Sequence, residues 1–480
     1  MNFFVNKAMG IGNSGVEHAE FYRKKMFEFE NLPYRFIFVD LIPNLHEAMK
    51  KWNLSNTEVI NMWEFFCFGK TLVTDKFTEN KYGYQTKIIV DSTNTNRERV
   101  TETSSGMRIV EHIVKFPEKN KKQLIVSVSR IDIYITKTGG KKISFEYLED
   151  AHRDTRIANI HIYDFDKKHL FFQNEVLLRR FFFEQLNLIF AEPNNFIIDR
   201  DEVSEVALFN NRIPKSRLIE VIHADHLSDR DDVEFPLWNN YYEYLLTHLE
   251  MVDKVVVATE LQKKDLLIDF PSLANKFVVI PVGGVRDRTI LPHNKSKIPP
   301  FKLITMSRLA QEKHIDLDIK AVCVLHSMGY NIIFDIYGQG GERGALQKLI
   351  DSNKAESYIN LKGLTDKPDD VYPNYDAFIS ASFSEGFGLT YIEALNASLP
   401  VLTFKARFGA LELIKDNVNG LLKDYKRNDD KFNIRNLVEG LVQLQDVDIY
   451  NRLRSNTSKT VERYQDHVIA DKWRKLIDEL

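Results

Sequence analysis

Short apolar segments alternate with longer amphipathic segments through the second half of the chain, and this alternation constrains the fold more than any other feature of the sequence. The segments predicted to be strands are 301–306, 331–337, 358–362, 376–381 and 400–404, and helices are predicted between them. Apolar strands separated by helices form a parallel sheet that helices cover on both faces. The second half is therefore predicted to be one Rossmann-like α/β domain.

The first part of the chain begins with the same alternation and then departs from it. Strands are predicted at 2–9 and 34–40, but the segments from about 71 to 172 alternate apolar and polar residues with a period of two. Hairpin signals such as Gly139-Gly140 interrupt these segments. After them the α/β alternation resumes. The pattern predicts an antiparallel β insertion within a first Rossmann-like domain.

The 480 residues are too many for one ordinary hydrophobic core, so more than one domain is expected. The polar, proline-bearing stretch 294–300 is predicted to link two domains. The predicted organisation is an N-terminal Rossmann-like domain over 1–70 and 173–293, a β-rich insertion over 71–172, a C-terminal Rossmann-like domain over 294–460, and a final helix over 461–480.

The composition is typical of a soluble globular protein, with 44% hydrophobic residues, 28% charged residues and a net charge of −3. Acidic and basic residues are intermixed, so no basic face predicts nucleic-acid binding. Cys67 and Cys323 are the only cysteines, which excludes a disulfide framework and favours a reducing compartment. Neither a secretory leader nor an apolar run of about 18 residues is recognised. A cytoplasmic location is predicted.

Two glutamates, Glu385 and Glu393, follow the predicted strand 376–381 and are separated by seven residues. The sequence between them runs from a glycine-rich turn into a predicted helix, where backbone N–H groups and the positive helix end favour an anion. Carboxylates do not help to bind a phosphate, but they can accept hydrogen bonds from the hydroxyl groups of a sugar or a ribose. The ligand is therefore predicted to be a nucleotide sugar.

Two cationic residues occur upstream in the same predicted domain. Arg308 ends its first strand and Lys313 opens the helix that follows. Both can reach the crevice at the carboxyl ends of the strands, where open α/β sheets bind ligands. Together they could neutralise a diphosphate and stabilise it as a leaving group without a metal. Taken alone, each could also be a solvated residue at a helix start.

These residues resemble the signature of the retaining glycosyltransferases of family 4, which have the GT-B fold. The resemblance implies two Rossmann-like domains that face a cleft, with a C-terminal helix that crosses back to the first domain. It also implies that Glu385 lies against the transferred sugar and that Glu393 binds the ribose hydroxyls. For the phosphates of the donor, the backbone amides of Gly388, Leu389 and Thr390 at the helix start are predicted to serve. The turn with Gly363 and Leu364 ends another predicted strand on the same sheet edge, so its main-chain groups are predicted to hold the base, although a glycine after a strand is common.

A second glycine-rich turn, Gly10-Ile-Gly12-Asn-Ser-Gly15, matches the dinucleotide-binding pattern G-x-G-x-x-G, and Asp40 closes the second predicted strand. Binding of NAD is one hypothesis, but a dehydrogenase would leave the cations and glutamates of the second domain without a role. In GT-B enzymes this turn faces the donor phosphates, and Gly15 is predicted to allow close backbone approach. A purely structural tight turn is the alternative.

The segment from His223 to His226 ends a predicted strand of the first domain. Alternation puts His223 and Asp225 on one side and His226 on the other, so the segment does not supply a tetrahedral metal site. The resemblance implies that His223 lies near the donor sugar and the acceptor and polarises a hydroxyl group or a sugar oxygen. An ordinary hydrogen-bonded histidine at a strand end is the alternative.

Four segments make the resemblance more specific, to one subgroup of these enzymes: 10–23, 222–226, 237–241 and 307–316. They are similar to Gram-positive glycosyltransferases that add N-acetylglucosamine to serine-rich or Ser-Asp-repeat surface adhesins, with wall-teichoic-acid glycosyltransferases as cousins. This implies UDP-N-acetylglucosamine as donor, no metal or other cofactor, and a polypeptide acceptor modified on serine. The sequence does not decide whether the chain forms a homo-oligomer, works with a partner glycosyltransferase or makes peripheral contact with a membrane. It also does not decide whether the donor sugar is N-acetylglucosamine or glucose. The β-rich insertion is predicted to bind the acceptor or to mediate oligomerisation.

Two further hypotheses concern the acceptor and the activity itself. A polyol-phosphate wall polymer would favour a basic groove on the insertion, and the lysines available are Lys119, Lys121, Lys122, Lys141 and Lys142. A Ser-Asp repeat is also acidic, so these lysines do not decide between the acceptors. A non-catalytic co-activator of a partner enzyme would be expected to lose donor-site residues, whereas the two cations and the two glutamates are all present.

Overall fold

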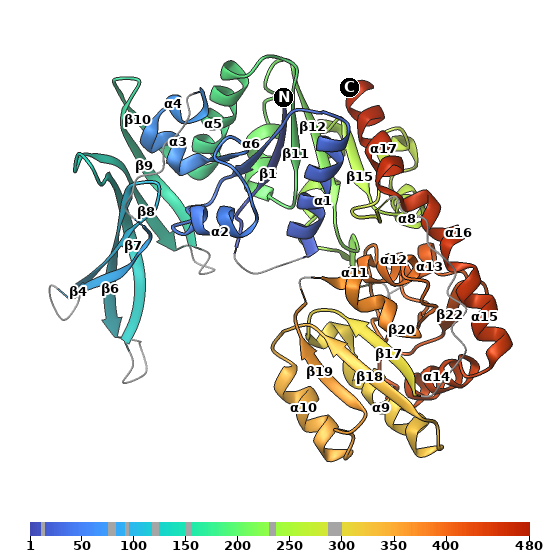
Figure 1. Ribbon diagram of the computed structural model, residues 1–480. Helices are drawn as coiled ribbons and strands as arrows, with labels where there is room; N and C mark the ends of the chain where they lie inside the picture. Colours follow the sequence, from blue (N-terminus) through green and yellow to red (C-terminus); the bar gives the residue numbers. More distant parts are fainter. Residues whose placement is uncertain are drawn as a thin grey trace. The chain divides into compact units, whose positions relative to one another are not determined.

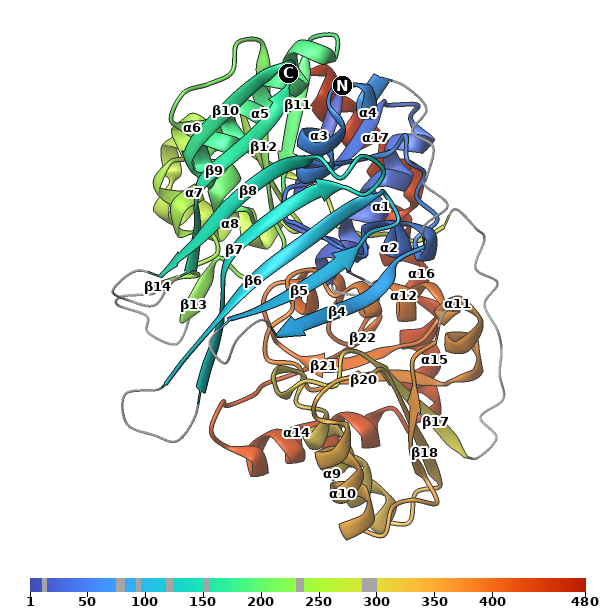
Figure 2. The same ribbon diagram turned by 90° about the vertical axis from the view of Figure 1, so that its left-hand side faces the viewer.

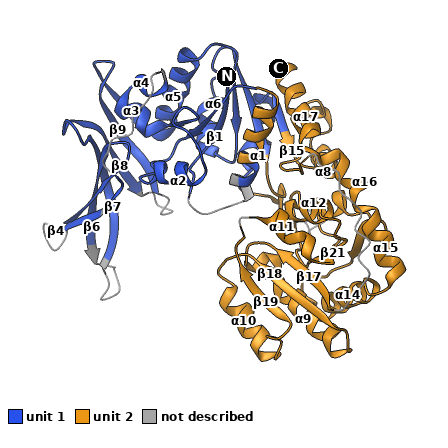
Figure 3. Cartoon of the chain, in the orientation of Figure 1, with its two compact units in different colours: residues 1–20, 32–221, 240–255 blue, residues 21–31, 222–239, 256–480 orange. Residues whose placement is uncertain are grey.

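The computed structural model describes residues 1–10, 15–74, 83–91, 96–117, 124–149, 155–229, 237–286, 300–365 and 367–480. These residues divide into two compact units (Figure 3). The first consists of 1–20, 32–221 and 240–255, and the second of 21–31, 222–239 and 256–480. Two segments that precede the predicted linker, 21–31 and 222–239, therefore belong to the second unit.

A six-stranded sheet forms the centre of the second unit, in the order β19-β18-β17-β20-β21-β22 (Figure 1). All neighbouring strands are parallel, as the alternation of apolar strands and helices predicts. The strands are β17 (Phe301–Met306), β18 (Ile332–Tyr337), β19 (Ile359–Gly363), β20 (Ala377–Ser380), β21 (Val401–Phe404) and β22 (Gly420–Lys423). The main helices around them are α9 (Ile315–Ser327), α10 (Arg343–Ser352), α12 (Leu389–Asn396) and α14 (Asp430–Gln443).

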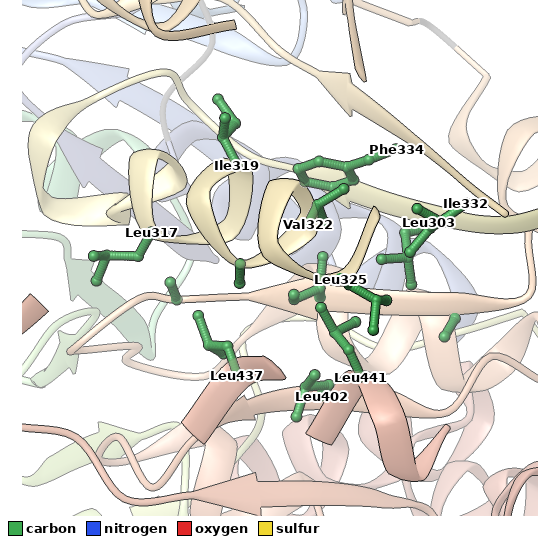
Figure 4. Close-up of a cluster of buried hydrophobic side chains, with 14 of the residues drawn as sticks. Leu303, Leu317, Ile319, Val322, Leu325, Ile332, Phe334, Leu402, Leu437 and Leu441 are labelled. Atoms are coloured by element: carbon green, nitrogen blue, oxygen red, sulfur yellow. The ribbon is translucent and has the colours of Figure 1, made fainter. Parts of the chain in front are cut away.

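The core of the second unit lies where α9 and α14 pack against each other and against the sheet. Figure 4 shows Leu325 of α9 close to Leu441 of α14, and Val322 of α9 close to Phe334 of β18. Val322, Leu325 and Leu441 are fully buried. Burial of each such side chain contributes about 1.5–3 kcal/mol, so this core holds the strands whose ends carry the candidate site residues.

The sheet of the first α/β domain has the order β16-β15-β12-β11-β1-β2-β3. Its strands are β1 (Asn2–Asn6), β2 (Tyr34–Phe38), β3 (Val59–Asn61), β11 (Asn194–Ile198), β12 (Ser216–Ile222), β15 (Lys254–Val257) and β16 (Phe277–Val279). The pairings of β1, β2, β3, β11 and β12 with one another are parallel. Helices α1 (Gly15–Phe29), α5 (Glu175–Ile189), α6 (Glu202–Phe209) and α8 (Glu260–Asp269) accompany this sheet.

The inserted segment forms a seven-stranded antiparallel sheet, which confirms the prediction from its period of two (Figure 2). Its strands are β4 (Gln85–Asp91), β5 (Asn96–Glu102), β6 (Met107–Pro117), β7 (Leu124–Ile135), β8 (Lys141–Glu149), β9 (Thr155–Phe165) and β10 (Lys168–Asn174). One face packs on α3 (Met62–Phe68), where the rings of Trp63 and Phe145 are 4.7 Å apart. The insertion is thus attached to the rest of the first unit through aromatic contacts.

The C-terminal residues do not form one continuous helix, although 461–480 has a helical pattern. Helix α16 (Thr457–Val461) and a 3-10 turn lead to Gln465, whose extended backbone (φ −68°, ψ 149°) ends the helical run. Helix α17 (Asp466–Asp478) then packs on α1: Tyr22 donates to Asp466 at 2.8 Å, and the rings of Phe27 and Trp473 are 5.5 Å apart. These contacts explain why 21–31 belongs to the second unit.

Other differences are local. The helix predicted at 239–251 is reduced to α7 (Glu243–Thr247) and a 3-10 turn at Leu249–Met251. Both cysteines are free; Cys67 is buried and Cys323 packs against the core. None of the helices in the described ranges has the length and apolar content needed to cross a membrane.

Candidate active site

The candidate site lies where the order of strands in the second sheet reverses. The chain runs from β17 outward to β18 and β19, and then returns to the other side of β17 to form β20. The loops after β17 and β20 therefore leave the sheet side by side at its carboxyl edge, which is the usual ligand site of open parallel sheets. Arg308 and Lys313 follow β17, and Glu385 follows β20.

Backbone hydrogen bonds to the loop after β21 hold the turn that carries Glu385. The amide of Glu385 donates to the carbonyl of Arg407 at 2.9 Å, and its carbonyl accepts from the amides of Phe408 and Gly409 at 2.6 and 2.9 Å. At the end of the turn, Gly388 has a left-handed backbone with φ 85° as the N-cap of α12. A side chain is disfavoured in this conformation, so glycine fits the turn.

Lys313 and Glu385 form an ion pair across the two loops. The ammonium Nζ lies 2.6 Å from Oε1 of the carboxylate, and the two side chains are 23% and 17% exposed. Partial burial lowers the effective dielectric constant, so the pair is stronger than one in open water. The lysine retains two further N–H donors for a ligand. The structure thus brings together two of the predicted site residues.

Arg308 does not join this pair. Its guanidinium contacts the carboxylate of Glu312 one turn later, and both side chains are exposed, at 68% and 57%. An exposed pair of this kind contributes little to stability. The guanidinium can therefore exchange Glu312 for another anion at small cost.

Glu393 lies on α12 (Leu389–Asn396), largely buried, and Tyr372 holds its carboxylate. The phenol OH of Tyr372 donates to Oε2 of Glu393 at 3.0 Å. Burial raises the pKa of Glu393 to about 7, an effect that the hydrogen bond from Tyr372 opposes and the charge of Asp369 increases. Burial also raises the pKa of Tyr372, so its hydroxyl is a permanent donor. Near neutral pH, Glu393 is therefore divided between a carboxylic acid and a carboxylate.

The remaining donor-side residues are backbone positions. Leu389 and Thr390 are the first two residues of α12, where amides have no intrahelical acceptor and the helix dipole favours an anion. Gly363 ends β19 with φ 80°, and its carbonyl accepts from the amide of Gly338 at 2.8 Å. Leu364 is 64% exposed. The end of β19 and the start of α12 lie at the same edge of the sheet as the ion pair.

The segment that starts at His223 packs against the Glu385 turn. A Cβ atom on Gly386 would lie 2.6 Å from the carbonyl oxygen of His223, so only glycine allows this approach. Nearby, the buried ring of His226 stacks on Phe408 at 5.8 Å. The structure thus places His223 beside the turn, and its role toward a substrate stays a prediction.

Two further predictions concern Gly15 and metal binding. Gly15 begins α1 in the first unit, and the residues 11–14 of its turn lie outside the described residues, so its approach to phosphates stays a prediction. In the described part of the chain, no group of three or more His, Cys, Asp or Glu residues could hold a metal ion.

Several residues of the site gave no signal in the sequence. Tyr372 reaches Glu393 from a 3-10 turn, and Arg407 and Phe408 reach Glu385 from the loop after β21. His314 and Phe383, which flank the ion pair in sequence, form a ring stack. An aromatic or cationic residue next to a motif is common, and only the spatial pairing distinguishes these residues.

Comparison with known proteins identifies a family model that matches part of the chain and proteins that are similar over nearly all of it. Residues 288–459 match the family model described as Glycosyl transferases group 1. The whole chain is similar to a protein of Streptococcus parasanguinis described as UDP-N-acetylglucosamine–peptide N-acetylglucosaminyltransferase GtfA subunit, with 28% identity over 99% of this chain and 98% of that protein. A Staphylococcus aureus protein described as poly(ribitol-phosphate) alpha-N-acetylglucosaminyltransferase is 25% identical over 99% of each chain.

Solved structures show the same similarity in three dimensions. The pneumococcal O-GlcNAc transferase GtfA, solved in complex with UDP and GlcNAc, has a TM-score of 0.72 and 26% identity, and the similarity covers 100% of this chain and 98% of that one. The likeness therefore includes both α/β domains and the inserted sheet.

Proposed function

We propose that this chain, which has the GT-B glycosyltransferase fold, transfers N-acetylglucosamine from UDP-N-acetylglucosamine to serine hydroxyls of a polypeptide, with retention at the anomeric carbon. The assignment of the donor rests on the Lys313–Glu385 ion pair. This pair lies where the strand order reverses, in a domain that matches the glycosyl transferases group 1 model. The acceptor half is supported by similarity over nearly the whole chain to relatives described as peptide N-acetylglucosaminyltransferases.

The charges and donors of the site suit a UDP-sugar. Lys313 can bind a phosphate oxygen while it keeps Glu385, because an ammonium group has three donors. Arg308 can exchange its exposed partner Glu312 for the diphosphate, and the first amides of α12 face the same anion. Glu385 then accepts from hydroxyls of the sugar and Glu393 from hydroxyls of the ribose. Each group has one task in this arrangement.

The chemical step requires no nucleophile from the protein. The bond from the anomeric carbon to the phosphate oxygen breaks, the serine oxygen bonds to the same face of that carbon, and the departing phosphate takes the serine proton. Lys313 and Arg308 stabilise the charge that develops on the diphosphate. His223 polarises the acceptor hydroxyl or a sugar oxygen. Because two cations neutralise the leaving group, the proposal includes activity without a metal or other cofactor.

The acceptor that we propose is a serine-rich or Ser-Asp-repeat surface adhesin, whose extended repeats would be recognised by the inserted sheet. In the described part of that sheet, Lys141 and Lys142 already pair with Asp132 and Asp164 at 3.0 and 2.8 Å. Lys119, Lys121 and Lys122 lie outside the described residues. The second candidate, a polyol-phosphate polymer, is favoured by the Staphylococcus aureus relative, which has lower identity.

The relatives described as a GtfA subunit support a second component. We propose that the chain works with a partner glycosyltransferase or as a homo-oligomer. A non-catalytic role in such a complex is less consistent with the site, because Lys313, Glu385 and Glu393 are all present and engaged. The activity is assigned to the cytoplasm, where free cysteines such as Cys67 persist.

The test is intact-mass spectrometry of a Ser-Asp-repeat polypeptide incubated with the protein, UDP-N-acetylglucosamine and EDTA. The control variants are Glu385→Ala and, as a matched change at an exposed glutamate of the same unit, Glu356→Ala. We expect mass steps of one N-acetylhexosamine that disappear with Glu385→Ala and persist with Glu356→Ala.

Other outcomes would redirect the proposal. Release of UDP without a mass step would favour the polyol-phosphate acceptor. Steps that require a divalent metal would contradict the metal-independent mechanism. Steps that persist in Glu385→Ala would remove this carboxylate from the reaction, and no release of UDP from UDP-N-acetylglucosamine, alone or with a partner chain, would overturn the donor assignment.

A further inference from the structure

The residue after Lys313 has a left-handed backbone, which is uncommon for a residue other than glycine. His314 joins the 3-10 turn Gln311–Lys313 to α9 (Ile315–Ser327) and has φ 48° and ψ 35°, in the left-handed region. This region is disfavoured for a residue with a Cβ atom, and glycine occupies it most readily. The side chain of His314 makes a contact that can offset the cost of this backbone.

The imidazole of His314 stacks on Phe383. The ring centroids are 3.8 Å apart and the planes differ by 26°. Phe383 stands two residues before Glu385 and is buried. Phe383 also stacks on Tyr425 at 4.7 Å, and the OH of Tyr425 donates to the carbonyl of Phe383 at 3.2 Å. Tyr425 therefore holds both the ring and the backbone of Phe383, and His314 stacks on a buried, well-packed ring.

This stack joins the two loops that carry the ion pair. His314 adjoins Lys313 on one loop, and Phe383 belongs to the chain that leads into Glu385 on the other. Burial lowers the pKa of His314 below its usual range, so the ring is neutral at pH 7 and adds no charge beside Lys313. The contact can thus set the separation of the loops without competing for the anion.

We propose that His314 is a positioning residue, whose stack on Phe383 holds Lys313 at the distance from Glu385 that binding of the donor diphosphate requires. The proposal rests on the function proposed above for Lys313 and Glu385. An aromatic stack is strong enough to change ligand affinity by about three- to tenfold when it is removed. The left-handed backbone is then retained because it directs the ring toward Phe383.

Two substitutions separate the ring from the backbone. Asparagine tolerates the left-handed region but cannot stack, whereas phenylalanine stacks but is less suited to that region. We expect His314→Asn to weaken UDP binding about three- to tenfold in calorimetric titrations and His314→Phe to retain most of it. Thermal melting would check that each variant is folded. If the His314 ring only stabilised the fold, His314→Asn would lower the melting temperature without changing the dissociation constant of UDP.

The matched control is His326, at the other end of α9. Its ring stacks on Tyr358 at the same centroid distance, 3.8 Å, about 18 Å away by the rise of the helix. His326→Asn removes a similar stack and should leave UDP binding unchanged.

His314→Phe could fail only because phenylalanine does not fit the left-handed backbone at position 314. A double-mutant cycle that combines His314→Asn with Phe383→Leu covers this case. If the stack is the cause, His314→Asn has no further effect on UDP binding in the Phe383→Leu background. Normal UDP binding by His314→Asn, or additive effects in the cycle, would overturn the inference while the donor site stands. Failure of the unsubstituted protein, alone or with a partner chain, to bind UDP would overturn the proposed function and the inference with it.

Discussion

Removing the hydroxyl group of Tyr372 is the most direct test of how Glu393 serves the donor. In the structure that hydroxyl donates to Oε2 of Glu393 at 3.0 Å, and burial has raised the pKa of Glu393 to about 7. Tyr372→Phe keeps the buried ring and deletes only the donor. Because the hydrogen bond stabilises the carboxylate more than the acid, its loss should raise the pKa of Glu393 further.

The size of the shift follows from the strength of the bond. A hydrogen bond to a charged group contributes about 1.5–3 kcal/mol, and one pKa unit corresponds to about 1.36 kcal/mol. The pKa of Glu393 should therefore move up by about one to two units. Near pH 7 the ionised fraction would fall from about one half to about one tenth or less. If ribose hydroxyls need the carboxylate as acceptor, UDP affinity at pH 7 should fall at least about fivefold.

The assay is calorimetric titration of UDP between pH 6 and 9.5. For the unsubstituted protein, affinity should rise as pH increases through about 7, because Glu393 gains its charge there. For Tyr372→Phe the same rise should occur at higher pH, and the two proteins should bind almost equally at pH 9.5. Tyr375→Phe is the control, since Tyr375 is also buried and donates to a carboxylate, that of Asp335, at 2.6 Å. An unchanged midpoint in Tyr372→Phe would refute the reasoning.

Three further predictions concern other parts of the structure. Lys313→Ala should lower kcat/KM for UDP release about 10²-fold, because the developing charge loses a fixed cation, whereas Lys320→Ala on α9 should not; a loss below tenfold would contradict this role. Gly386→Ala should weaken activity, since its Cβ would meet the His223 carbonyl at 2.6 Å, and Gly341→Ala, with open space around it, should be neutral. Burial raises the pKa of Glu205 to about 8, so the folded state binds a proton that the unfolded state releases above about 4.5, and stability should fall as pH rises from about 4.5 to 8. In urea unfolding at pH 5 and 8.5, the decrease in the free energy of unfolding should be about 2–5 kcal/mol smaller for Glu205→Gln than for the unsubstituted protein. An equal decrease in both proteins would contradict the raised pKa of Glu205.

The architecture was largely predictable because its signals are local. The parallel sheet of β17 to β22 follows from apolar segments separated by helices, and the antiparallel insertion follows from a period of two with hairpin residues such as Gly139. Boundaries were less predictable. The chain after Val461 has helical periodicity throughout, but the extended backbone at Gln465 breaks it so that α17 can pack on α1.

The candidate site was predictable only in part. The spacing of Glu385 and Glu393 and the cations upstream identified the two loops, and strand order brings these loops together. That Lys313 reaches Glu385 while Arg308 pairs with Glu312 could not be read from spacing, because both cations follow the same strand. The direction of each side chain depends on packing that the loops acquire only in the folded chain.

Local patterns in the sequence were enough to predict the elements, their alternation and the charged groups of the site, because periodicity and turn chemistry act between residues a few positions apart. Tertiary structure alone decided which groups meet: Tyr372 with Glu393, and His314 with Phe383. Such pairs join residues far apart in the chain, and their geometry depends on strand order and on buried contacts that no local pattern records. The same burial sets the pKa of Glu393, so the chemistry of a residue chosen by the sequence is completed by the fold.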